Sequence, residues 1–196
     1  VVRQRDGFMI VDEIYHGLTY GVQPPTALTF GDDIFVVNSF SKYFGMTGWR
    51  VGWLVVPEGY EEVADRLAGN IFISATTHSQ LAAVAAFSDD SIGILEERRD
   101  AFQRRRDFLL PELQGLGFDV KCQPEGAFYL YADCSRFTDD SFAFCFDLLE
   151  KTGVAITPGK DFGQNEASSH VRFAYANSIA NMTEAVSRLK SYLAGV

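Results

Sequence analysis

The segment from Asn38 to Gly52 holds the side chains best suited to chemistry in this sequence. Lys42 follows an apolar run that is typical of a buried strand, and α/β folds place their ligands at the ends of such strands. Partial desolvation at this kind of position favours the neutral form of an amine, which can attack a carbonyl carbon. We therefore interpret Lys42 as a candidate nucleophile.

The same segment carries groups that suit an anion. Arg50 offers a planar guanidinium that can hold two oxygens of a phosphate. Ser39 and Ser41 add hydroxyl donors, and Gly45 and Gly48 let the backbone turn tightly. A single lysine or arginine is usually a solvated surface residue. The combination of strand, serines, glycine loop and arginine instead indicates a phosphate-containing ligand.

Asp12 ends an earlier apolar run, and Tyr15 follows it closely. Two interpretations of this pair are open. The carboxylate of Asp12 could pair with a cationic ring nitrogen while the Tyr15 hydroxyl meets a neighbouring ring oxygen. Alternatively, Asp12 and Glu13 cap a turn.

The elements that must position these residues can be inferred from hydrophobic patterning. Three short runs that are apolar throughout predict strands in a parallel or mixed sheet covered on both faces, with some antiparallel pairs: Phe8–Val11, Ile34–Val37 and Val51–Val56. Helices are predicted next, from Pro57 to Ile71, from Ser79 to Phe87 with a buried or interface role, and from Ser91 to Leu113.

Beyond Gly117 the pattern changes to short strands that alternate with helices. The predicted strands are Phe118–Lys121, Phe128–Ala132, Val154–Ile156 and Val171–Ala174, and the predicted helices are Ser141–Lys151 and Met182–Ala194. This pattern is typical of an α+β lobe, a small sheet with helices on one face.

Composition limits the possible functions. The 196 residues are 47% hydrophobic and 22% charged, as in an ordinary globular protein. A formal net charge of −9 argues against binding to nucleic acid or to anionic lipid. No apolar stretch is long enough to span a bilayer. Three cysteines without a C-x-x-C motif indicate buried free thiols in a reducing cytoplasm, and the scattered histidines predict no metal site.

An arginine-rich stretch between Arg98 and Arg106 has to be weighed against that exclusion. Acidic residues alternate with these arginines at helical spacing, which favours ion pairs on a solvated helix face. We therefore do not interpret this stretch as a nucleic-acid site.

Taken together, the motifs resemble the class I/II aminotransferase family of fold-type I pyridoxal-phosphate enzymes. The matching motifs are D-E-I-Y at 12–15, S-F-S-K at 39–42, G-W-R-V-G-W at 48–53, T-T-H-S-Q at 76–80, P-E-G-A-F-Y at 124–129, P-G-x-x-F-G at 158–163 and V-R-F-A-Y-A at 171–176. They occur in the family's order and extend over nearly the whole chain. The lysine motif with its arginine is the most specific of them.

The resemblance implies a role for each candidate residue. It identifies Lys42 as the lysine that forms a Schiff base with pyridoxal 5′-phosphate and then moves the proton between substrate and cofactor. Asp12 would keep the pyridinium nitrogen protonated so that the ring acts as an electron sink. Tyr15 would donate to the cofactor's phenolate oxygen.

Ser39, Ser41 and Arg50 correspond, by the same resemblance, to phosphate ligands. Arg172 corresponds to the arginine that binds the substrate's α-carboxylate through a bidentate fork. The alternative for Arg172 is an exposed strand arginine. The implied substrates are an amino acid and a 2-oxo acid.

The resemblance also implies an architecture. We expect an α/β fold: the C-terminal part of the large cofactor domain, with a mixed, mostly parallel sheet, at 1–88. A long connecting helix at 89–115 and a small C-terminal α+β domain at 116–196 would follow. Family members are roughly twice as long and act as homodimers. Because the chain also begins with Val1, we expect a fragment, the C-terminal half of an enzyme, with impaired or no activity alone.

Two other functions share these motifs. A pyridoxal-phosphate-dependent β-C–S lyase needs the same lysine, aspartate and arginine. An aminotransferase-like domain also serves as the sensor of certain transcription regulators, where a basic helix-turn-helix precedes it, and this sequence contains no such motif. The preferred hypothesis is a transaminase.

Overall fold

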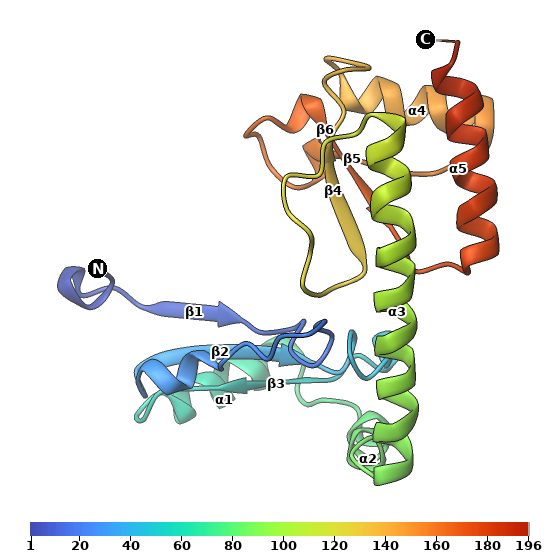
Figure 1. Ribbon diagram of the computed structural model, residues 1–196. Coiled ribbons are helices and arrows are strands. Elements are labelled where there is room, and N and C mark those ends of the chain that lie inside the picture. Colours follow the sequence, from blue (N-terminus) through green and yellow to red (C-terminus); the bar gives the residue numbers. More distant parts are fainter. Residues whose placement is uncertain (196) are drawn as a thin grey trace. The chain divides into compact units, whose positions relative to one another are not determined.

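A computed structural model describes residues 1–195 (Figure 1). The chain divides into two compact units, the first ending at Arg99 and the second beginning at Asp100. The division falls inside the long helix α3 (Asp89–Leu116), which is the helix expected over 89–115. The assignment to a large-domain part, a connecting helix and a small domain stays a prediction.

Unit 1 is built on a three-stranded sheet in the order β1-β2-β3. The strands are β1 (Met9–Asp12), β2 (Ile34–Ser39) and β3 (Gly52–Val55), close to the three expected runs. β1 pairs parallel with β2, and β2 pairs antiparallel with β3, so the predicted mixture of pairings is confirmed. The last residues of β1 and β2 and the first residue of β3 therefore lie at the same edge of the sheet.

The expectation that all three strands are covered on both faces is wrong. Ile34 and Val36 of β2 are buried in a small cluster with Ala27. On β1, by contrast, Ile10 is 69% exposed, and Leu54 on β3 is 49% exposed. An apolar strand sequence records a preference for burial, but actual burial requires other segments to pack on the strand.

Two helices follow the sheet in unit 1, α1 (Glu61–Ile71) and α2 (Thr77–Ala85). α1 begins later than expected because Pro57 starts a turn, in which its carbonyl accepts the Tyr60 N–H. α2 contributes Ala83 to a second small core cluster. Ser79 and Ala83 of this helix are buried, whereas its Leu81 and Val84 side chains are exposed, and the alternative interface role stays a prediction.

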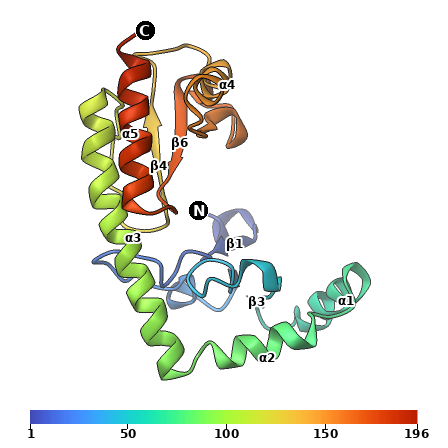
Figure 2. The same ribbon diagram turned by 90° about the vertical axis from the view of Figure 1, so that its right-hand side faces the viewer.

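Unit 2 contains an antiparallel sheet in the order β4-β6-β5, with two further helices. The elements are β4 (Tyr129–Asp133), α4 (Ser141–Thr152), β5 (Thr157–Pro158), β6 (His170–Ala174) and α5 (Ile179–Leu193). In Figure 2 the C-terminal part of α3 lies beside α5, next to this sheet. Short 3-10 turns complete the two units, at Arg3–Arg5, Ala27–Phe30, Thr47–Trp49, Gly159–Asp161 and Ala167–Ser169.

Side-chain caps fix where the helices of unit 2 begin. The Asp140 carboxylate accepts the N–H groups of Phe142 and Ala143 at the start of α4. The Ser178 hydroxyl accepts the Asn181 N–H at the start of α5, which therefore begins at Ile179 rather than at Met182. Such caps satisfy backbone donors that have no partner inside the helix.

Two predicted strands of unit 2 are not observed as predicted. The segment 118–121 contributes a single bridge, between Asp119 and Asp133. The strand expected at 154–156 is displaced to Thr157–Pro158, which pair with Arg172 and Val171. A strand is defined by its partner's hydrogen bonds, and apolar patterning carries no information about which residues find a partner.

Two side chains have a burial opposite to the expectation. Arg106 is 5% exposed, and it donates to the Pro124 carbonyl at 2.7 Å and to Asp107, so it does not lie on a solvated face. Cys122 is exposed, whereas Cys134 and Cys145 are buried free thiols as expected. Within residues 1–195 no helix is both long and apolar enough to cross a bilayer.

Candidate active site

Six of the seven predicted site residues belong to unit 1. They lie in or beside three chain segments that reach the same edge of the β1-β2-β3 sheet. Asp12 closes β1, Ser39 closes β2, and Lys42 lies in the loop that follows. Arg50 precedes β3, which begins opposite Ser39 at Gly52. One parallel and one antiparallel pairing thus bring the three segments to one edge, the position where open α/β sheets bind ligands.

The serine hydroxyls form a small donor cluster at this edge. Ser39 Oγ lies 3.0 Å from Ser41 Oγ and accepts the Ser41 N–H at 3.1 Å. Ser39 Oγ also reaches the Val51 carbonyl at 3.4 Å, which ties the end of β2 to the residue after Arg50. Both serines are half-buried, so their hydroxyls face a partly desolvated position that suits an anion.

Arg50 is held by a strained turn. Its φ of 51° places it in the left-handed region, which costs a non-glycine residue about 1 kcal/mol. Its Nη1 donates to the Thr47 carbonyl at 2.9 Å, while the Thr47 hydroxyl donates to the Ser41 carbonyl at 2.7 Å. Arg50 and Ser41 therefore share Thr47 as a common neighbour, a link that the sequence analysis did not identify.

Gly52 is required by the close approach of the two strands. A Cβ at this position would lie 2.5 Å from the Asn38 carbonyl oxygen, which is shorter than real Cβ contacts. The glycine therefore allows β3 to pair with Asn38 and Ser39, and it sets the distance between the serines and the turn that holds Arg50.

Lys42 is half-buried, and its Nζ lies 5.7 Å from the centroid of the Tyr15 ring. This distance is within the range of a cation–π contact. The Lys42 carbonyl accepts the Gly45 N–H at 3.0 Å, which closes the turn that the glycine was expected to allow. The structure thus brings Lys42 and Tyr15 together.

Asp12 and Glu13 have opposite surroundings. Asp12 is exposed, and its Oδ1 accepts the Ile14 N–H at 2.9 Å, which is the turn cap considered as one interpretation. Glu13 is 5% exposed and accepts the Ala27 N–H at 2.6 Å and the Thr26 hydroxyl at 3.0 Å. The hydrogen bonds of Glu13 therefore hold the loop after β1 in place, whereas the Asp12 carboxylate is exposed to solvent at the same edge of the sheet.

Arg172 belongs to unit 2, on β6, and is not the exposed arginine of the alternative interpretation. Its guanidinium carbon lies 4.7 Å from the Phe162 ring centroid and 5.5 Å from that of Tyr129. Its Nη2 donates to the Thr157 hydroxyl at 3.4 Å. Its Nε is buried and has no hydrogen-bond partner among residues 1–195, an arrangement that leaves a donor available for an anionic oxygen.

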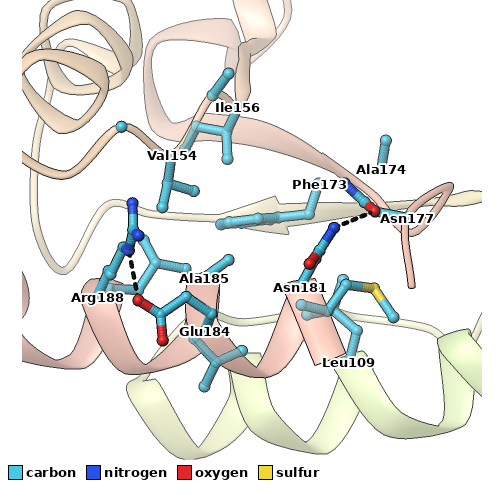
Figure 3. Close-up of a pocket in the computed structure, with 15 residues that line it drawn as sticks. Leu109, Val154, Ile156, Phe173, Ala174, Asn177, Asn181, Glu184, Ala185 and Arg188 are labelled. Atoms are coloured by element: carbon cyan, nitrogen blue, oxygen red, sulfur yellow. Dashed lines mark hydrogen bonds and ion pairs between the residues drawn. The ribbon is translucent and has the colours of Figure 1, made fainter. Parts of the chain in front are cut away.

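A cavity of about 430 Å³ in unit 2 contains none of the predicted site residues (Figure 3). It lies between the segment 153–156, the end of β6 and α5, and apolar side chains such as Ile156 and Phe173 line it. Its polar side chains bond to each other: Asn181 donates to Asn177, and Arg188 pairs with Glu184. The donors and acceptors suited to catalysis are at the Lys42 edge instead.

The sequence reasoning missed three contributors to these surroundings. Glu13, considered only as part of a turn cap, and Thr47 position loops through hydrogen bonds to backbone groups. Tyr129, which belongs to the predicted strand Phe128–Ala132, faces the Arg172 guanidinium. The sequence did contain a signal for the role of Glu13, because an acidic residue at the end of an apolar strand needs hydrogen-bond partners if it is buried.

Comparison with protein families gives a match to the aminotransferase class I and II family over residues 1–189. A valine–pyruvate aminotransferase of Mycobacterium tuberculosis is 43% identical over 187 residues, which are 94% of this chain and 48% of that protein. A probable aspartate/prephenate aminotransferase of Aquifex aeolicus is 36% identical over 97% of this chain and 50% of its own length. The chain spans about half the length of the curated relatives it matches.

Solved structures give the same result. The crystal structure of an aminotransferase from Mycobacterium tuberculosis superposes with a TM-score of 0.93 at 42% identity, over 99% of this chain and 51% of that one. A Thermus thermophilus aspartate aminotransferase double mutant has a TM-score of 0.88 at 33% identity, over 97% of this chain and 49% of that one. The α/β fold of this chain is that of these enzymes.

Proposed function

Because this chain belongs to the class I and II aminotransferase family, we propose that its Lys42 edge binds pyridoxal 5′-phosphate. The whole protein then transfers an amino group from an amino acid to a 2-oxo acid. The observation that carries the proposal is that one edge of the sheet holds both a half-buried lysine amine opposite the Tyr15 ring and a hydrogen-bonded pair of serine hydroxyls, Ser39 and Ser41.

The residues at this edge fit the parts of that cofactor. Ser39, Ser41 and Arg50 supply the neutral and cationic donors that a phosphate needs, and the strained backbone at Arg50 is the kind of feature that clusters at ligand sites. Asp12 offers a carboxylate oxygen for the pyridinium N–H, and Tyr15 offers a phenol for the ring oxygen beside it.

When bound, the cofactor supplies an electron-withdrawing ring that stabilises negative charge at the substrate's α-carbon. In this assignment, Lys42 is the group that holds the cofactor covalently and then carries a proton at Nζ. Both tasks need the amine beside the cofactor, and the half-buried Lys42 Nζ lies opposite the Tyr15 ring that is assigned to the same cofactor.

Arg172 is assigned to the substrate's carboxylate. Its buried Nε lacks a partner in the described part of the chain, so a carboxylate oxygen would satisfy a donor that folding has already desolvated. The rings of Phe162 and Tyr129 beside the guanidinium hold it in place and exclude water from it.

The remaining assignments follow from the family. We assign unit 2 to the small α+β domain, and the whole protein to a homodimer that acts in the cytoplasm. Since the chain spans about half the length of its relatives, full activity is assigned to the whole protein. For this chain alone we propose weak cofactor retention and little or no amine transfer.

A titration of the purified chain with pyridoxal 5′-phosphate tests the proposal. We expect an absorbance band at longer wavelength than that of the free aldehyde, and borohydride reduction should leave one added phosphopyridoxyl group on the peptide that contains Lys42. Lys42→Ala should abolish both signals, whereas Lys190→Ala, an exposed lysine on α5, should retain them. Labelling spread evenly over several lysines would contradict the assignment.

A further inference from the structure

Tyr43, the residue after Lys42, packs against the loop that carries Tyr15. A Cβ added to Gly17 would lie 2.8 Å from Cγ of the Tyr43 ring, so the ring occupies the space that a side chain at position 17 would take. Gly17 also has a φ of 85°, a conformation that favours glycine. The two loops therefore meet through the Tyr43 ring.

The other end of the Tyr43 side chain is fixed on α3. The Tyr43 hydroxyl donates to Glu96 Oε1 at 2.5 Å, and the other oxygen of Glu96 pairs with Arg99 one turn further along the helix. Burial and the neighbouring carboxylate raise the pKa of Tyr43 to about 12. The phenol therefore keeps its proton, and with it the hydrogen bond, throughout the neutral range.

These contacts have a geometric consequence for Lys42. Lys42 Nζ lies over the ring of Tyr15, while the ring of the next residue in the chain lies against Gly17 of the same 12–17 loop. Fixing Tyr43 at its ring and at its hydroxyl restricts how far the lysine loop can move relative to this loop. The amine is thereby kept opposite Tyr15.

We propose that Tyr43 and Glu96 are positioning residues that hold Lys42 opposite Tyr15, at the place where the amine meets an aldehyde. The inference rests on the proposed function, because it assigns the two residues a role in the chemistry of Lys42. Neither residue has to touch cofactor or substrate.

Three substitutions separate the hydrogen bond from the rest of the contact. Tyr43→Phe keeps the ring against Gly17 and removes the hydroxyl. Glu96→Ala removes the acceptor, whereas Glu96→Gln keeps an acceptor oxygen and removes the negative charge that pairs with Arg99. Glu97→Ala, at an exposed neighbouring position, is the matched control.

The first measurement is hydrogen–deuterium exchange of the unliganded chain over residues 40–46. This segment contains the Gly45 N–H bonded to the Lys42 carbonyl and the Met46 N–H bonded to the Phe40 carbonyl. We expect at least about threefold faster exchange in Tyr43→Phe and Glu96→Ala, since the open form becomes more populated. Glu96→Gln and Glu97→Ala should exchange like the original chain.

The second measurement follows borohydride trapping of Lys42 by pyridoxal 5′-phosphate as its concentration rises. A positioning role predicts that the maximal trapping rate falls roughly three- to tenfold in Tyr43→Phe and Glu96→Ala, because misplacing a reacting group slows attack. The half-saturating concentration should stay within about twofold, since Ser39, Ser41 and Arg50 are unchanged. Glu96→Gln should restore the rate.

The two measurements distinguish the failure of this inference from that of the proposed function. If pyridoxal 5′-phosphate does not label Lys42 in the original chain, the proposed function fails, and exchange over 40–46 still decides whether Tyr43 and Glu96 restrain the lysine loop. If labelling occurs but exchange and maximal rate are equal in all variants, the inference is overturned. It is also overturned if Glu96→Gln is as slow as Glu96→Ala.

Discussion

At the scale of single residues, the unpaired donor of Arg172 allows a prediction about stability. Its Nε is buried without a hydrogen-bond partner in residues 1–195, and a buried unpaired donor costs about 1–3 kcal/mol. The contacts with Phe162 and Tyr129 offset part of that cost. We predict that Arg172→Met, which keeps the length of the side chain, raises the free energy of unfolding by about 1 kcal/mol in urea titrations.

Arg104→Met is the control for this prediction, because Arg104 is an exposed arginine of α3. The unfolding free energy of this variant should stay within about 0.5 kcal/mol of the original. A clear loss of stability in Arg172→Met would show that the guanidinium is satisfied within the folded chain, contrary to its assignment as a carboxylate donor.

The cysteines allow a second prediction at this scale. Burial raises the pKa of Cys134 to about 11 and that of Cys145 to about 12, so both remain thiols at pH 8–9, whereas Cys122 is exposed. The thiolate is the reactive form. Iodoacetamide at pH 8 should therefore alkylate Cys122 of the native chain quickly and the other two only after unfolding. Mass spectrometry of the labelled peptides provides the measurement, and Cys122→Ser should remove the fast phase.

At the scale of elements, the start of α5 depends on one hydroxyl. Ser178 Oγ accepts the Asn181 N–H at 3.2 Å and satisfies a donor that the helix leaves unpaired. Ser178→Ala should lower the free energy of unfolding by about 1 kcal/mol. Ser187→Ala, at an exposed position within the same helix, should leave stability equal or slightly higher, since alanine has the higher helix propensity. Equal losses in both variants would contradict a capping role.

Gly52 supports a prediction about the sheet edge. Alanine at this position would place a Cβ 2.5 Å from the Asn38 carbonyl oxygen, at the pairing that also brings Ser39 toward Arg50. We expect Gly52→Ala to lower the free energy of unfolding by about 2 kcal/mol or more, as measured in thermal melts. The substitution should also weaken trapping of Lys42 by pyridoxal 5′-phosphate. Gly69→Ala in α1, where a Cβ would meet open space, should be neutral or stabilising in the same thermal melts.

At the scale of the whole molecule, the two units differ in how much they bury. Unit 2 has fully buried side chains such as Leu130, Leu148 and Tyr175, whereas unit 1 leaves β1 and the apolar residues of α1 exposed. Because local stability follows buried apolar area, backbone amides of unit 1 should exchange faster. Hydrogen–deuterium exchange should show β1 (Met9–Asp12) exchanging before β6 (His170–Ala174), and the reverse order would contradict this picture.

How far the sequence predicts this molecule depends on the kind of interaction. The strands β1–β3 and the helices α3, α4 and α5 were predictable because hydrophobic periodicity and caps are local signals. The segments 118–121 and 154–156 were mispredicted because strand pairing depends on residues far away in the chain. Arg106 was mispredicted for the same reason, since the Pro124 carbonyl that accepts its hydrogen bond lies in another segment.

The sequence by itself determined which residues could do chemistry, because residue type and spacing give Lys42 and Arg50 their motif and give the chain its family. The tertiary structure alone decided how those residues are held. It paired Ser39 with Gly52, buried Glu13 while leaving Asp12 exposed, and joined Tyr43 to Glu96. Hydrogen bonds and steric contacts act between atoms that folding brings together, and distance along the chain does not encode them.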